Sequence, residues 1–100
     1  MLFAPNLIKS WVETRIDVFS ENGWNVELQL PKENDGINKA GFVIERGVKT
    51  FSVTLWGTGM MEIISYDDET DDVTSSDIEL ASESEILDKL DQFSADVLSG

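Results

Sequence analysis

The sequence predicts an α+β fold in the order α-β-β-β-β-β-α, with an antiparallel sheet and both helices packed on one face. Three observations lead to this prediction. Apolar residues recur at helical spacing near both ends, the middle alternates apolar and polar residues as strands do, and the connections between strands are short. Short connections favour antiparallel neighbours, because a parallel pair needs a long crossover. The length of 100 residues predicts a single domain over residues 1–100.

The first helix is predicted over residues 6–21. Pro5 and Asn6 suit the start of a helix, and Asn22-Gly23 suits its end, because glycine readily adopts the left-handed conformation found there. One apolar stripe at three- and four-residue steps is formed by Leu7, Ile8, Trp11, Val12, Ile16 and Phe19.

Five strands are expected between the helices. They are predicted at residues 24–30, 39–46, 49–56, 60–66 and, more weakly, 73–80. The connections are a loop at 32–38, tight turns at 47–48 and 57–59, and an acidic turn at 67–72. In the third strand, Phe51, Val53 and Leu55 face one way, and the polar residues and Trp56 face the other. The fifth strand carries serines, Asp77 and Glu79, which suit a sheet edge protected by charge.

The last helix is predicted over residues 83–98. Ser82 and Glu85 have the spacing of a capping box, and Glu83 adds negative charge where the helix dipole favours it. The apolar stripe is formed by Ile86, Leu87, Leu90, Phe93 and Val97.

Charge is distributed unevenly along the chain. The net charge is −13; residues 62–100 hold thirteen acids and one base, whereas residues 1–61 hold seven acids and six bases. Such a field repels nucleic acid and anionic membranes and attracts basic proteins, so we predict a basic protein partner, no nucleic acid and no membrane. The alternative explanation is that the acidity only keeps the protein soluble.

The residue types argue against catalysis. The chain has no cysteine and no histidine, so it lacks the commonest general base and metal ligand. A serine nucleophile would need another oriented base, and the carboxylates lie in predicted turns and on polar helix faces, where they stay ionised. A calcium loop starting at Asp68 would need glycine where Val73 stands. We therefore predict a protein that is not an enzyme and has no cofactor and no metal.

The chain also lacks membrane and export signals. No apolar run reaches the roughly 20 residues needed to cross a bilayer, and residues 1–5 do not read as a signal peptide. We expect a soluble, cytoplasmic protein.

Trp56 is the most notable candidate for binding. Trp11 and Trp24 fit apolar core positions, but Trp56 falls on the polar side of its strand, beside Gly57-Thr58-Gly59. Tryptophan is enriched among interface hot spots, and packing within the exposed face is the alternative.

Three segments resemble the TriTu-type immunity proteins, which neutralise Rhs-type polymorphic toxins. They are residues 39–45, residues 53–59, and residues 62–64 with the acidic turn that follows. The helices at Trp11-Val12 and Ser82 to Phe93 also fit that layout, although the family is expected to have a more polar Trp-x-Ser-Gly pattern around Trp56. The resemblance implies a monomer that binds a cognate toxin domain one to one, with an ADP-ribosyltransferase that modifies elongation factor Tu as a candidate toxin.

The sequence thus predicts an immunity protein that blocks the active site or the substrate-docking surface of a toxin. Trp56 would be the anchor, and the acidic turn would steer the encounter. A secretion chaperone or adaptor for an effector, and an acidic mimic of nucleic acid, are the two alternatives. The predicted toxin-binding residues are Trp56, Glu62, Asp67, Asp68, Glu69, Asp71 and Asp72.

Overall fold

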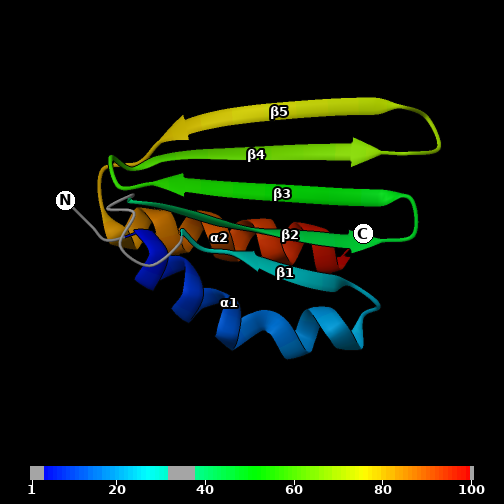
Figure 1. Ribbon diagram of the computed structural model, residues 1–100, viewed down its shortest axis with the longest axis horizontal. Coiled ribbons are helices and arrows are strands. Elements are labelled where there is room, and N and C mark those ends of the chain that lie inside the picture. The colour runs from blue at the N-terminus through cyan, green and yellow to red at the C-terminus, as the bar shows by residue number, and fades with distance from the viewer. Residues whose placement is uncertain (1–3, 32–37, 100) are drawn as a thin grey trace.

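A computed structural model describes residues 4–31 and 38–99 and has the predicted order of elements (Figure 1). The elements are α1 (Ala4–Glu21), β1 (Asn25–Gln29), β2 (Lys39–Arg46), β3 (Lys49–Trp56), β4 (Met60–Asp67), β5 (Asp72–Glu79) and α2 (Glu83–Ser99). The predicted α+β fold is therefore confirmed. Most of the predicted loop at 32–38 lies outside the described residues. None of the helices in the described ranges is long and apolar enough to span a membrane.

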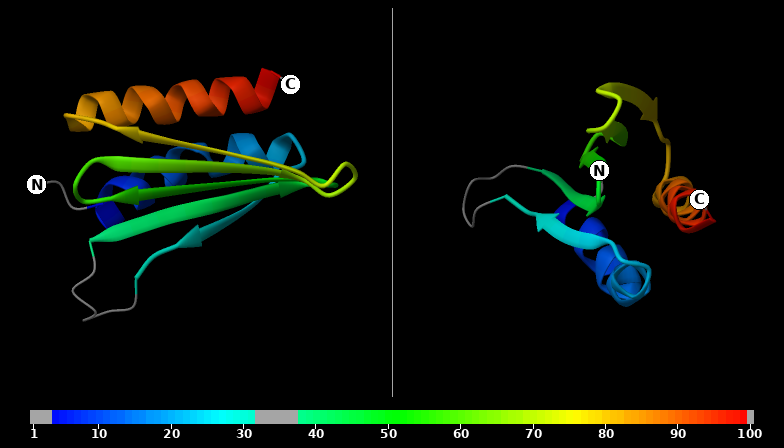
Figure 2. Two further views of the ribbon diagram at one scale, coloured as in Figure 1. Left: turned by 90° about the horizontal axis from the view of Figure 1, so that it is seen from above. Right: turned by 90° about the vertical axis from the view of Figure 1, so that its right-hand side faces the viewer.

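The sheet is an antiparallel meander in the order β1-β2-β3-β4-β5. Both helices lie on the same side of it (Figure 2). Residues paired across antiparallel strands share a face, so the pairs of Phe42 with Leu28 and of Val53 with Ile63 line the side beneath the helices. The predicted alternation along β3 is confirmed, because Val53 and Leu55 are fully buried.

Phe42 lies at the centre of the core. Its ring stacks on Trp11 of α1 at 5.4 Å and meets Phe93 of α2 edge-on at 6.0 Å. One side chain of the sheet thus touches both helices. The predicted core positions of Trp11 and Trp24 are confirmed. Ile16, which was predicted in the apolar stripe of the first helix, is 40% exposed and lies outside the core.

The start of α1 differs from the prediction. The helix begins at Ala4, and its N–H donates a hydrogen bond of 2.7 Å to Oδ1 of Asn38. Asn6 is therefore not the cap, because a side chain from 34 residues away takes that role. The predicted end is confirmed: Gly23 has a φ of 86° and its N–H bonds to the carbonyl of Ser20.

The predicted cap of α2 is present. Ser82 Oγ accepts the N–H of Glu85 at 3.2 Å, and Glu85 Oε2 accepts the N–H of Ala81 at 2.7 Å. The glutamate reaches one residue further back than in the usual capping box, so it also fixes the chain entering the helix.

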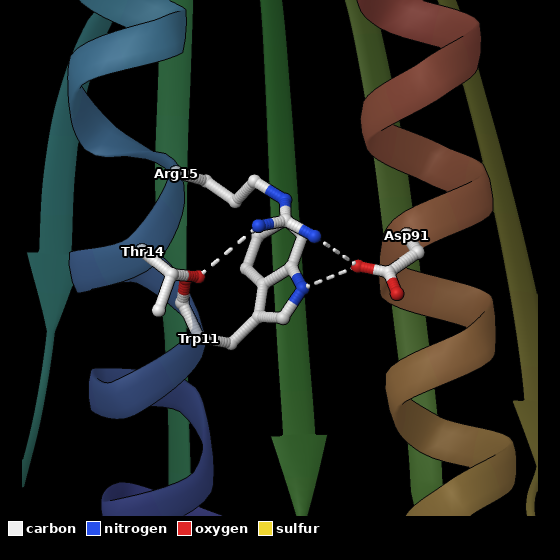
Figure 3. Close-up of polar contacts among 4 residues, drawn as sticks. All are labelled: Trp11, Thr14, Arg15 and Asp91. Atoms are coloured by element: carbon white, nitrogen blue, oxygen red, sulfur yellow. Dashed lines mark hydrogen bonds and ion pairs between the residues drawn. The ribbon is translucent and has the colours of Figure 1, made fainter.

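A polar clasp joins the two helices (Figure 3). Trp11 Nε1 and Arg15 Nη2 both donate to Oδ1 of Asp91, at 2.9 and 2.8 Å. Thr14 Oγ1 accepts a long bond of 3.4 Å from Arg15 and donates to the Trp11 carbonyl. The indole N–H of Trp11 is the largest cause that lowers the pKa of Asp91 below its ordinary value of 3.8. Desolvation opposes it, and the hydrogen bond and charge of Arg15 lower the pKa further.

Trp11→Phe is expected to raise the pKa of Asp91 toward its ordinary value, because it removes the largest stabiliser of the carboxylate. Since the folded pKa is depressed, the clasp stabilises the fold above the unfolded pKa and is lost as the pH falls through the folded pKa. An NMR titration of the Asp91 carboxyl measures this, with Arg15→Gln as a control that should raise the pKa less. An unchanged pKa in Trp11→Phe would contradict the assignment.

Candidate binding surface

The face of the sheet turned away from the helices, here called the open face, carries a mixture of acids and large side chains. Its residues alternate with those of the core, as the pleat requires. On β2 to β5 it presents Lys39, Gly41, Val43, Glu45, Thr50, Ser52, Thr54, Trp56, Met60, Glu62, Ile64, Tyr66, Val73, Ser75, Asp77 and Glu79. None of the described helices covers this face (Figure 2).

Trp56 lies on the open face at the end of β3 and is half-buried. The ammonium group of Lys39, its partner on β2, lies 5.3 Å from the ring centroid. This is a cation–π distance, and it holds the indole against the sheet. On the other side, Glu62 pairs with Thr54, the next open-face residue of β3, so its carboxylate lies diagonal to Trp56.

The strand register extends this group to the edge of the sheet. Glu62 pairs with Asp77 of β5, and Met60 pairs with Glu79. We call the resulting surface the Trp56 patch. It consists of Lys39, Trp56, Met60, Glu62, Asp77 and Glu79.

Glu62 and Asp77 place two negative charges directly opposite each other. Like charges at such a pair destabilise a sheet. The sequence holds no lysine or arginine between Lys49 and Lys89, so neither β4 nor β5 brings a base to the pair. A cation delivered by a partner would relieve this repulsion.

The β4–β5 hairpin differs from the predicted acidic turn. Asp67 and Asp72 are paired strand residues, so the connecting loop is residues 68–71. Oδ1 of Asp67 accepts the N–H groups of Glu69 and Thr70 at 3.0 and 3.3 Å. Asp67 therefore closes the turn as a side-chain cap of the loop.

Tyr66 fixes the rest of the loop. Its hydroxyl hydrogen bonds to Asp68 at 3.1 Å and to Asp71 at 3.3 Å, and Asp71 adopts a left-handed φ of 57°. The hydrogen bond to Asp68, followed by desolvation, the charge of Asp68, the hydrogen bond to Asp71 and the charge of Asp67, raises the pKa of Tyr66 above its ordinary value. Thr70 Oγ1 also bonds to Asp72 at 3.0 Å. The hairpin carboxylates thus organise the turn itself.

The predicted binding residues fall into two groups. Trp56 and Glu62 belong to the Trp56 patch, whereas the five acids at 67–72 lie at the opposite end of the sheet. Met60 and Asp67 are seven residues apart along β4, which corresponds to about 23 Å. The hairpin acids are therefore too far away to touch a side chain that is anchored on Trp56.

The acids of the last third do not gather on one face. Some lie on the open face, some in the hairpin, and the remainder along α2. They occupy consecutive elements, β4, β5 and α2, while six of the seven bases precede β4. The charge asymmetry of the sequence becomes an asymmetry between the two halves of the fold.

Sequence reasoning missed the participation of Asp77, Glu79, Met60 and Lys39 in the patch. Asp77 and Glu79 were expected only as charges that protect an edge, and pairing them with β4 requires the register.

Within residues 4–31 and 38–99, no group of three or more acids is arranged to hold a metal ion. A groove of about 270 Å³ lies on the helix side of the sheet, between α2 and the side chains of Phe51 and Ile63, and its lining is largely apolar.

Comparison with protein-family models, with curated proteins and with solved structures finds no match to this chain.

Proposed function

We propose that this chain is an immunity protein that binds a cognate bacterial polymorphic toxin in the cytoplasm and neutralises it. The observation that carries the proposal is the Trp56 patch: a half-buried indole on an uncovered sheet face, adjoining three acids of β4 and β5, two strands that contain no base. An aromatic anchor whose surroundings hold three acids and one lysine carries net negative charge, which suits a basic protein partner.

The acids far from Trp56 and the residues of the Trp56 patch would have different roles in binding the toxin. The acids of the hairpin and α2 attract a basic surface from a distance, because long-range attraction needs net charge and no contact. Trp56 and Met60 then bury apolar area, and Glu62 and Asp77 pair with bases of the toxin. A toxin whose substrate or cofactor is anionic has a basic cleft, so the same contact would occlude its active site or docking surface. An ADP-ribosyltransferase, with its anionic dinucleotide, is one such toxin.

Neutralisation is tested with any toxin domain that a gene adjacent to the gene for this chain encodes. Co-expression is expected to rescue growth, and purified protein should abolish the activity of the isolated domain at one chain per toxin. Binding that leaves the activity intact would contradict immunity and favour a chaperone or adaptor. Failure to rescue growth and to co-purify would refute the proposal altogether.

The Trp56 patch is tested by removing charge at matched places. Glu62→Gln with Asp77→Asn is expected to weaken toxin binding about tenfold or more, because it removes contact charges. Asp88→Asn with Asp96→Asn removes the same net charge from the exposed side of α2 and should change the affinity about twofold or less. Surface plasmon resonance at several salt concentrations measures both. Equal losses in the two double variants would mean that only net charge matters.

A further inference from the structure

We propose that the free edge of β5 accepts an extended segment of the partner, with lysine or arginine at alternate positions, as a sixth strand of the sheet. The added strand specifies how the partner of the proposed function docks. The inference depends on the proposed function only for the identity of that partner.

The edge of β5 is long, regular and open. β5 ends the sheet order, and all eight of its residues are exposed. It pairs with β4 without a register shift from Asp72 to Glu79, and it contains no proline and no lysine, two devices that commonly block an edge. β1, at the other edge, has five residues, is followed closely by Pro31 and lies against α1.

The backbone groups that point outward follow from one hydrogen bond. The N–H of Leu80 donates to the carbonyl of Gly59, its partner in the same register, at 2.9 Å. Residues at even positions of β5 therefore bond to β4, and those at odd positions point away from it. Four N–H groups and four carbonyls are thereby presented to solvent, those of Val73, Ser75, Asp77 and Glu79.

These residues also determine which strand fits. Their side chains lie on the open face, so a residue paired with Asp77 or Glu79 would place its Cβ atom about 5 Å away. A lysine or arginine there would pair with the acid and approach Glu62 on the next strand. Val73, which is 60% exposed, suits the aliphatic stem of the lysine or arginine at the corresponding alternate position.

A second copy of the chain fits the edge poorly. Antiparallel pairing of two β5 strands must match odd positions with odd positions. Centred on Ser76, it would set Glu79 against Val73 and Asp77 against Ser75, so four acids would gather along the joint edge, and neither strand carries a base. Charge complementarity therefore selects a basic strand over self-association.

The edge is continuous with the Trp56 patch. Asp77 and Glu79 belong to both, and Met60 connects them to Trp56 across β4. A partner that adds a strand to β5 can therefore also cover Trp56 with the residues next to that strand.

The test uses the purified chain and a capped synthetic peptide of about eight residues that alternates lysine and valine. NMR is expected to show shifts and slowed amide exchange at Val73, Ser75, Asp77 and Glu79. Ser75→Pro removes one outward N–H without touching the β4 ladder, and it should weaken peptide binding at least tenfold. Ser75→Ala keeps that N–H and should bind as the wild type does. A peptide of alternating glutamate and valine is the charge control and should not bind.

Two outcomes would overturn the inference: no change at the four outward amides, or equal binding by Ser75→Pro and Ser75→Ala. The melting temperature of both variants separates lost binding from lost folding. If wild type and Ser75→Pro neutralise the toxin equally, the immunity function stands and the added strand does not. If the peptide binds as expected but the toxin is unaffected, the edge inference stands and the immunity function does not.

Discussion

Phe42→Ala is expected to lower the free energy of unfolding by about 3–5 kcal/mol. Phe42 is fully buried, stacks on Trp11 and meets Phe93, so its removal leaves a cavity bordered by both helices. A chain of 100 residues has a total stability of only about 5–15 kcal/mol, so much of the molecule's stability would be lost.

Urea unfolding followed by tryptophan fluorescence measures this loss. The control is Val43→Ala, the next residue of β2, which is half-buried on the open face and should cost about 1 kcal/mol or less. Similar losses for the two variants would mean that Phe42 does not hold the helices on the sheet. The comparison is matched because both positions lie in the middle of the same strand.

Trp56→Ala is expected to weaken toxin binding by about 30-fold or more, which corresponds to the roughly 2 kcal/mol that defines a hot spot. The indole is half-buried and adjoins Met60 and Glu62, so a partner that covers it would bury a large apolar ring between charged groups. Truncation also releases Lys39, whose charge would then lie free on the patch.

Isothermal titration with the isolated toxin domain measures the effect. Trp56→Phe retains a ring and should recover much of the affinity, and Val48→Ala, at an exposed turn on the far end of β3, is a control that should bind normally. Full affinity in Trp56→Ala would remove the anchor from the proposal. The hairpin and the edge of β5 would then remain as the candidate contacts.

The parts of the fold that depend on local signals were predictable from the sequence. The helix stripes, the strand alternation at β3, the Gly23 end of α1 and the Ser82 cap are each decided by residues within a few positions of one another. Periodicity and capping depend on residues close together in the sequence, so they can be predicted without the structure.

The parts that depend on distant contacts were not predictable. The start of α1 is set by Asn38, and the indole of Trp11 finds its acceptor at Asp91, 80 residues away. The Trp56 patch requires the register of three strand pairs. Asp67 and Asp72 were expected in a turn because aspartate disfavours strands, but pairing with each other and with Lys49 extends the sheet through them.

The clasp between Trp11 and Asp91 also affects the stage of synthesis at which the chain can fold. Phe42 is covered only when both helices are in place, because Trp11 of α1 and Phe93 of α2 each contact its ring. A nascent chain must therefore bring residues 80 positions apart together before the sheet is covered, and loop closure over such a span is slow. We expect folding to be cooperative and late during synthesis, so that a ribosome-bound fragment lacking α2 has no stable sheet to present to any partner.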